Sequence, residues 1–214
     1  MEHIEPAGIH SGDSACCLPA VSLGQGALST IRDWSRGLAL ALKVQGLINL
    51  QFAVQRDADG EEVVYIIEAN PRASRTVPFV AKATGQPLAR IATRLMAGET
   101  LQQVGLTTEP QPPLQTIKEA VLPFRRFPGA DTVLGPEMRS TGEVMGSADS
   151  FGMAYAKAEL GAGEALPTTG TVFLSTHNRD KPALVPVAER LAELGFALIA
   201  TSGTADVLTK AGLT

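Results

Sequence analysis

Two apolar runs in the first third of the chain are separated by a short polar loop. Residues 47–55 and 62–69 are rich in Val, Ile, Phe and Tyr, and the loop at 56–60 ends in glycine. This pattern predicts two antiparallel strands joined as a hairpin.

Alternation along these strands determines which side chains share a face. On the second strand, Ile66, Glu68 and Asn70 are expected on one face and Tyr65 on the other. A hairpin register that placed Gln51 of the first strand opposite Glu68 would make Gln51, Glu68 and Asn70 converge.

Helical periodicity flanks the hairpin. Apolar residues recur at steps of three and four within 27–43, which predicts a core helix with Trp34 on its buried face. After Pro78, two further helices are expected, the first closing at Gly85 and the second at Gly98. We expect all three to have structural roles.

The central part of the chain is more mixed. A proline-bearing connector at 107–116 favours extended backbone, and residues 117–147 contain strand-like pieces broken by turns. A helix at 150–160 and a glycine-containing linker at 161–169 follow.

The last 44 residues repeat a strand, helix, strand order. Residues 171–175 and 196–200 are apolar and extended, and Asp180 is expected to cap the helix between them. This order predicts a parallel βαβ unit. The turn at 201–204 opens another helix, where exposed amides suit a phosphate, although a plain capped loop fits the pattern equally well.

The hairpin carries the most distinctive candidate chemistry. Gln51, Glu68 and Asn70 offer one carboxylate and two amide carbonyls, oxygen donors of the kind that Mg²⁺ accepts beside nucleotide phosphates. Arg72 and Arg75 follow at once, and arginines beside a metal suit a transferring phosphoryl group. The spacing alone leaves open a polar strand end with two solvated arginines.

Composition excludes several classes of protein. The chain has 214 residues, 44% of them hydrophobic, and a net charge of -4. A hydrophobic content of this size argues against disorder throughout, and the acidic balance argues against a nucleic acid or an anionic membrane surface as the main partner. No apolar run approaches the ~20 residues that cross a bilayer. Cys16 and Cys17 are adjacent, without disulfide or metal-ligand spacing, which fits a reducing, cytoplasmic location.

Four strings of residues resemble one family in an unbroken order along the chain: HIEPAGIHSGDSACCLPA, IEANPRASRTVPFVAKATGQPLA, IKEAVLPFRRFPGAD and LGPEMRSTGEVMG. They resemble the large chain of carbamoyl-phosphate synthase, in its second ATP-grasp half. The resemblance covers essentially the whole chain, with a longer hairpin loop around 57–61.

The resemblance implies an α+β ATP-grasp fold, of which only the C-terminal lobe is present, followed by a helical connector and an incomplete α/β, Rossmann-like domain. The expected boundaries are 1–98 for the lobe, 99–169 for the connecting segment and 170–214 for the start of an allosteric domain similar to methylglyoxal synthase. We therefore expect the chain to be a fragment.

The resemblance also implies an activity, which is MgATP-dependent phosphorylation of carbamate to carbamoyl phosphate for arginine and pyrimidine biosynthesis. Such an enzyme is an ATP-dependent ligase that uses ATP and Mg²⁺ or Mn²⁺, and we expect the isolated piece to be inactive. The implied metal ligands are Gln51, Glu68 and Asn70, and Arg72 and Arg75 are the implied catalytic residues. The implied nucleotide contacts are Gly8, Ile9, His10, Ser11, Gln51 and Glu68.

Effectors and partners follow from the same resemblance. The positions matching an ornithine site are Glu5, Asp13 and Glu119, and those matching a nucleotide monophosphate site are Lys181, Thr201 and Thr204. The implied protein partners are the remainder of the large chain and a glutaminase small subunit.

Two alternatives remain open at this stage. The chain can be a non-catalytic effector-binding or packing fragment, since one lobe of the ATP site is absent. Another ATP-grasp ligase, such as a biotin carboxylase, shares the Glu-x-Asn-x-Arg pattern but is not expected to carry LGPEMRSTGEVMG.

Overall fold

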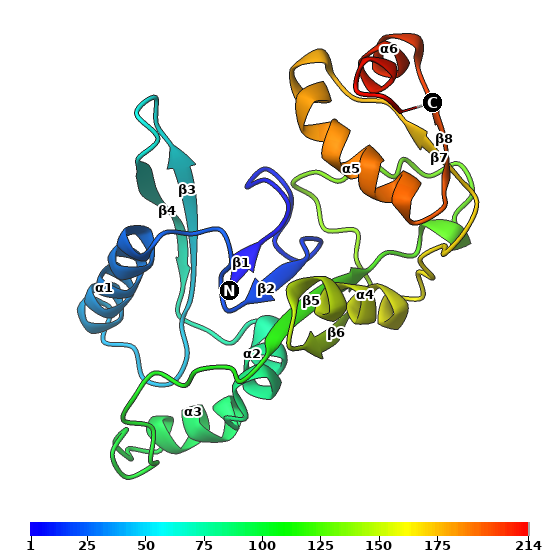
Figure 1. Ribbon diagram of the computed structural model, residues 1–214. Helices are drawn as coiled ribbons and strands as arrows, with labels where there is room; N and C mark the ends of the chain where they lie inside the picture. The colour runs from blue at the N-terminus through cyan, green and yellow to red at the C-terminus, as the bar shows by residue number, and fades with distance from the viewer. Residues whose placement is uncertain (214) are drawn as a thin grey trace. The chain divides into compact units, whose positions relative to one another are not determined.

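The computed structural model describes residues 1–213, which form two compact units, residues 1–164 and residues from 165 onward. Each unit is described by itself (Figure 1). The first contains β1 (Glu2–His3), β2 (Cys16–Leu18), α1 (Gln25–Ala41), β3 (Asn49–Arg56), β4 (Glu62–Asn70), α2 (Thr76–Thr84), α3 (Leu88–Met96), β5 (Gln115–Val121), the 3-10 turn η1 (Phe124–Arg126), β6 (Gly142–Ala148) and α4 (Phe151–Ala162). The second contains β7 (Thr171–Leu174), the 3-10 turn η2 (Asn178–Asp180), α5 (Lys181–Glu193), β8 (Ala197–Ala200) and α6 (Ser202–Lys210).

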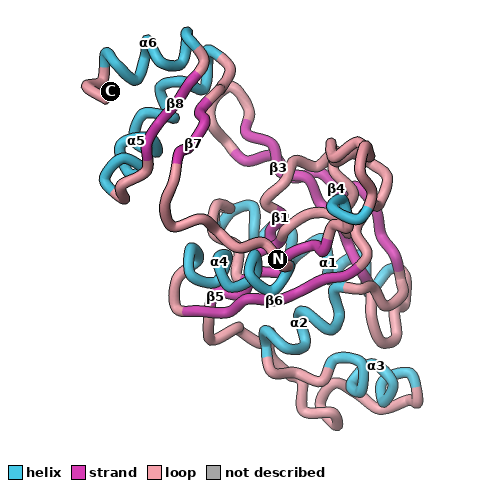
Figure 2. Tube along the Cα trace, turned by 90° about the vertical axis from the view of Figure 1, so that its right-hand side faces the viewer, coloured by secondary structure: helices cyan, strands magenta, loops and turns pink. Residues whose placement is uncertain are grey.

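A four-stranded antiparallel sheet is the centre of the first unit. Its strand order is β1-β2-β5-β6, so strands from the two ends of the unit lie side by side. Helix α4 covers one face of β5 and β6 (Figure 2). The core between them consists of Cys17, Ile117, Ala148, Ala154 and Ala158. The three alanines have small side chains, which let helix and sheet approach closely.

The segment at 99–169 is not the helical connector that we expected. Within its described residues it contributes two strands and only one α-helix, α4. Strand β5 pairs with β2 on one side and with β6 on the other, and its Ile117 lies in the core against α4. This segment thus completes the central sheet.

The predicted hairpin is confirmed as β3 paired with β4, and α1 lies along one face of it (Figure 1). Trp34 of α1 contacts Phe52 of β3, with ring centroids 6.5 Å apart. However, Trp34 is 43% exposed, so its prediction as a core residue is wrong. A two-stranded sheet is too narrow to enclose so large a ring.

A β-bulge corrects the predicted faces of β4. Gln51 pairs with Glu68, but the next residue, Phe52, pairs with Ile66, so Ile67 is the extra residue. As a result Ile66 lies on the face opposite Glu68, and Tyr65 lies on the same face as Glu68. Period-two alternation predicted the reverse, because it contains no signal for an inserted residue.

The second unit begins with a parallel pair of strands, β7 and β8, as predicted. Its core is Leu174, Ala188 and Leu208, packed with apolar residues of α5 and β8. Asp180 precedes α5, but its side chain makes no capping hydrogen bond, which corrects that prediction. Instead the Asp180 carboxylate pairs with Arg179, 3.4 Å away.

Helices α2 and α3 end just before Gly85 and Gly98 as predicted, but α2 begins at Thr76, so Pro78 lies in its first turn. Gly85 ends α2 in the left-handed region at φ 68°. Among residues 1–213, no helix is long and apolar enough to cross a membrane.

We predict that Gly146→Ala destabilises the first unit. An added Cβ would lie 2.2 Å from the Ala154 carbonyl oxygen and 2.5 Å from the Ala158 nitrogen, both fixed helix backbone. The expected loss in the free energy of unfolding is about 1–3 kcal/mol, measured by urea titration. Gly37→Ala adds the same methyl group in open space on α1, and the expected gain there is up to about 1 kcal/mol. Equal effects at the two positions would contradict the close packing of β6 against α4.

Candidate functional site

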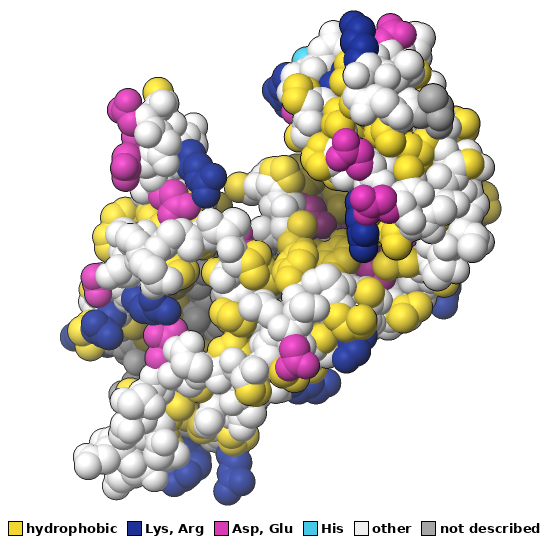
Figure 3. All heavy atoms as spheres, in the orientation of Figure 1, with side chains coloured by type: hydrophobic (Ala, Val, Ile, Leu, Met, Phe, Trp, Pro, Cys, Tyr) yellow, Lys and Arg dark blue, Asp and Glu magenta, His cyan; other side chains and the backbone are white. Residues whose placement is uncertain are grey.

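The hairpin register brings together the side chains that the sequence singled out. Gln51 pairs with Glu68, as the metal hypothesis required, and Asn49 pairs with Asn70. Both pairs lie at the end of the hairpin away from its loop. The loop carries acidic side chains, shown in magenta at the upper left of Figure 3. Because it lies at the opposite end of the hairpin, its extra length does not disturb these pairs.

The side-chain hydrogen bonds leave oxygen atoms free at this site. Gln51 Nε2 donates to Ser11 Oγ at 3.1 Å, and Asn49 Nδ2 donates to Ser74 Oγ at 3.2 Å. Each bond engages the amide nitrogen and leaves the amide carbonyl oxygen available. The exposed Glu68 carboxylate forms no ion pair with any residue of 1–213.

This donor set fits a hard cation such as Mg²⁺. It contains one carboxylate only, and residues 1–213 hold no group of three His, Cys, Asp or Glu side chains suited to a metal. A cation here would therefore need further anionic oxygens, which a nucleotide phosphate supplies.

The two predicted arginines behave differently. Arg75 reaches β6 and the segment before it, with its Nε 3.6 Å from Glu143 Oε1 and its terminal nitrogen 3.5 Å from Ser140 Oγ. Arg72 is exposed, and its guanidinium donates to the neighbouring Ala73 carbonyl. Arg75 is thus held beside the central sheet, whereas the Arg72 side chain faces solvent.

The loop between β1 and β2 carries the four predicted nucleotide contacts. Of these, Ser11 accepts the hydrogen bond from Gln51. His10 Nδ1 accepts from the Gly12 amide at 3.0 Å, and the His10 amide donates to Gly135. Gly8 and Ile9 precede this turn, and the Ile9 amide donates to Pro6. The structure therefore places Ser11, but not His10, in contact with the metal donor set.

Asp13, one of the three predicted ornithine contacts, joins two segments of the first unit by hydrogen bonds. The residue is 1% exposed, and its carboxylate accepts from the backbone amides of Arg139 at 2.7 Å and Ser140 at 2.8 Å. Burial alone would raise the pKa of Asp13, but these hydrogen bonds outweigh it and the pKa is lowered.

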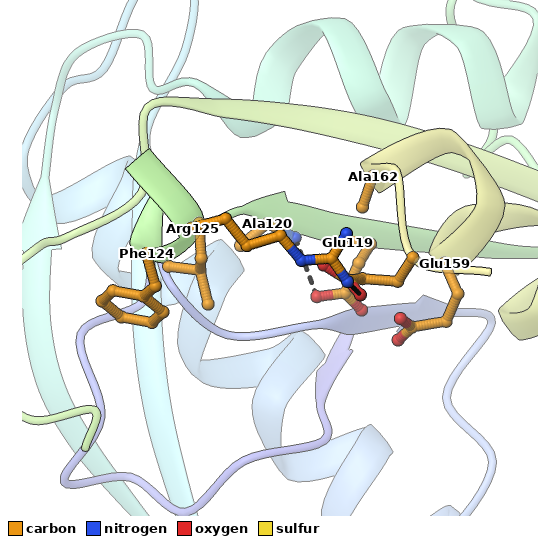
Figure 4. Close-up of a pocket in the computed structure, with 8 residues that line it drawn as sticks. Glu119, Ala120, Phe124, Arg125, Glu159 and Ala162 are labelled. Atoms are coloured by element: carbon orange, nitrogen blue, oxygen red, sulfur yellow. Dashed lines mark hydrogen bonds and ion pairs between the residues drawn. The ribbon is translucent and has the colours of Figure 1, made fainter. Parts of the chain in front are cut away.

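The other two predicted ornithine contacts lie near each other beside α4. Glu119 lines a cavity of about 400 Å³ with Glu159, Arg125 and Phe124. Figure 4 shows Glu119 and Glu159 coming from β5 and α4 to the same cavity. Glu5 accepts from the Ala15 amide at 2.7 Å, and its charge acts on Glu119.

Glu119 is electrostatically unusual. Its pKa is raised to about 7, first by burial and then by the carboxylates of Glu159 and Glu5, against a hydrogen bond from the Ala120 amide. One of its oxygens, Oε2, is buried without a hydrogen-bond partner among the described residues. Glu119 thus holds a buried acceptor without a partner beside the cavity.

In the second unit, the predicted nucleotide monophosphate contacts also meet. Lys181 Nζ donates to the Gly203 carbonyl at 2.7 Å, and Thr201 Oγ1 lies 3.3 Å from Thr204 Oγ1. Thr204 is 1% exposed, and its hydroxyl is engaged within the turn by Thr201.

Known proteins match the chain in two regions and along its whole length. Residues 1–104 match the model described as carbamoyl-phosphate synthase L chain, ATP binding domain, and residues 183–214 match the MGS-like domain. The large chain of carbamoyl phosphate synthase from Synechocystis is 62% identical over 213 residues, and that from Methanosarcina acetivorans is 55% identical over 213 residues. The chain belongs to the carbamoyl phosphate synthase large-chain family.

Each of these alignments covers 100% of this chain but only 19% of the relative's length. A solved biotin carboxylase domain of a single-chain bacterial carboxylase covers half of the chain at 32% identity, with a TM-score of 0.43. That score is too low to support an argument about the fold.

Several residues of these sites were missed by sequence reasoning. Asn49 pairs with Asn70 and hydrogen-bonds Ser74, and Glu159 lines the cavity with Glu119. The alternation of Asn49 with Gln51 was a usable signal for the first. Nothing in the local sequence relates Glu159 to Glu119, which lies 40 positions earlier.

We predict that Glu119→Gln stabilises the chain above neutral pH. The folded pKa lies above the ordinary 4.5, so the folded state binds more protons between pH 4.5 and about 7, and the contribution of Glu119 to stability falls as pH rises through that window. The variant should gain on the order of 2 kcal/mol relative to the wild type at pH 8, and almost nothing at pH 4.5. Urea titrations at the two pH values measure this, and a difference independent of pH would contradict the raised pKa.

Proposed function

We propose that this chain provides the metal-binding and phosphate-binding side of an MgATP site that phosphorylates carbamate to carbamoyl phosphate. The observation that supports it most directly is the Gln51–Glu68 pair in a chain of this family. The remainder of the large chain and a glutaminase small subunit are the partners that this proposal requires.

The surface beside the metal donors also suits a nucleotide. Beyond the bulge, the face that carries Gln51 and Glu68 continues with the Ala53–Tyr65 pair, and Tyr65 is 50% exposed. A nucleotide presents an apolar base and anionic phosphates, so it needs both kinds of surface. The second wall of the site would come from the remainder of the large chain.

The residues of the chain would act by position and charge. Gln51, Glu68 and Asn70 would hold Mg²⁺, which supplies charge neutralisation of the phosphate oxygens when bound. Arg75, fixed beside Glu143 and Ser140, would stabilise negative charge on the transferring group, and the exposed Arg72 would add a second positive charge beside it. No covalent nucleophile is needed, since carbamate is the acceptor.

A chimera tests this activity. The matching 213 residues of the Synechocystis large chain, 62% identical, are replaced with this chain, and carbamoyl phosphate formation is assayed with the Synechocystis small subunit. We expect activity in the chimera, and a loss of roughly 100-fold or more in the Glu68→Ala chimera, because the only carboxylate of the donor set is gone.

Glu61→Gln is the matched control, because it removes an exposed carboxylate in the hairpin loop. It should leave activity unchanged. The proposed function would be refuted if the chimera folds but is inactive while the Synechocystis enzyme is active. It would also be refuted if Glu68→Ala and Glu61→Gln lose the same amount of activity.

A second function is favoured by the unpaired Glu119 oxygen. We propose that the cavity between β5 and α4 binds a cationic amino acid such as ornithine, whose ammonium would pair with Glu119 and Glu159. The turn at Lys181, Thr201 and Thr204 is the proposed contact for a nucleotide monophosphate. The non-catalytic alternative, a chain that binds effectors alone, rests on these two sites.

Ornithine should raise the thermal unfolding midpoint of the chain. At a concentration about 100 times its Kd, the expected rise is roughly 5 °C or more. Norvaline, which lacks the side-chain ammonium, should not do so, and Glu119→Gln should remove the effect. A rise with both ligands, or one that persists in the variant, would exclude charge recognition by Glu119.

A further inference from the structure

Lys118 is the largest of the fully buried side chains in residues 1–213, and none of the sites above uses it. It lies on β5 and is 1% exposed. Its cross-strand neighbours are Cys16 and Met145, neither of which is charged at neutral pH. The Lys118 ammonium is therefore enclosed in the molecule.

No carboxylate in the described part of the chain forms an ion pair with this ammonium. Its one side-chain hydrogen bond goes to the Ser11 carbonyl oxygen, 3.4 Å away. Burying an ammonium without a counter-ion opposes folding, and an apolar side chain of the same length often serves a core better. Lys118 is therefore a poor choice if its only task is to fill space.

Its single partner is the residue that orients Gln51. The Ser11 carbonyl accepts from Lys118, and the Ser11 hydroxyl accepts from Gln51 Nε2. That bond engages the amide nitrogen and leaves Gln51 Oε1 available for a metal, in a residue that pairs across the hairpin with Glu68. The three residues form one chain from the central sheet to the hairpin.

We propose that Lys118 is a positioning residue that fixes the Ser11 main chain and thereby orients the Gln51 amide for metal coordination. Its significance rests on the proposed MgATP function, but the positioning itself can be measured without any ligand. No other side chain of the described residues donates a hydrogen bond to the Ser11 carbonyl.

Two-dimensional ¹H–¹⁵N spectra of the ligand-free chain test the positioning. The Gln51 side-chain amide signals are assigned by their loss in Gln51→Glu. Lys118→Met should shift them as Ser11→Ala does, and Lys118→Arg, which keeps the charge, should restore them. Thr116→Val is the matched control, because Thr116 is equally buried on the same face of β5 and bonds Ser147 instead.

The outcomes separate a positioning role from a structural one. The Lys118→Met chain should unfold at or above the wild-type midpoint, because an unpaired buried charge has been removed. A chain that fails to fold, or Gln51 signals that do not move, overturns the proposal. Signals that move equally in Thr116→Val overturn it as well.

Kinetic measurements on the Synechocystis chimera are the second test of the positioning role. There Lys118→Met should raise the half-saturating MgATP concentration by roughly 10- to 100-fold, the range for residues that orient a metal ligand. An inactive wild-type chimera would refute the proposed function, and the spectra would still decide the role of Lys118. An active chimera with unchanged MgATP dependence in Lys118→Met would refute the positioning role alone.

Discussion

The buried Asp13 carboxylate is the interaction on which the first unit depends. It joins the β1–β2 loop to the backbone of Arg139 and Ser140, residues 126 and 127 positions later in the chain. Hydrogen bonds to a charged acceptor are stronger than neutral ones, and here they more than offset the burial of the charge. A hydrogen bond in the opposite direction joins the same two segments, because Ser140 Oγ donates to the Gly12 carbonyl at 3.0 Å.

Both halves of the candidate site depend on that contact. It fixes the β1–β2 loop, so that Ser11 meets Gln51 of the hairpin. It also fixes the segment before β6, so that Ser140 and Glu143 meet Arg75. The metal donors come from one sheet and their supports from the other, and a site assembled in this way needs both sheets in place.

The sequence predicted those parts of this arrangement that depend on local pattern. Alternation in 47–55 and 62–69 predicted the hairpin, and the convergence of Gln51 with Glu68 depended on a register that only the structure supplies. The bulge at Ile67 was not predictable, because a single inserted residue leaves the composition of a strand unchanged. Trp34 was misplaced for a different reason, since helical periodicity shows which face is apolar but not how much of it the neighbouring sheet can cover.

Polar contacts between residues far apart in the chain could not be predicted from the sequence either. Asp13 was assigned to an effector by resemblance, yet its carboxylate is engaged by a segment more than a hundred residues away. Lys118 attracted no attention in the sequence, because a lysine on a strand is normally exposed. Only the pairing of β5 between β2 and β6 explains its burial.

Strand β5 carries both the buried ammonium of Lys118 and the Glu119 carboxylate that lines the cavity. Neighbouring residues of a strand face opposite sides of a sheet, so Lys118 points to the β1–β2 loop and Glu119 to the cavity beside α4. Their charges interact across the strand, since Lys118 acts to lower the pKa of Glu119. The buried ammonium and the carboxylate of raised pKa are therefore adjacent residues of one strand, on opposite faces of the central sheet.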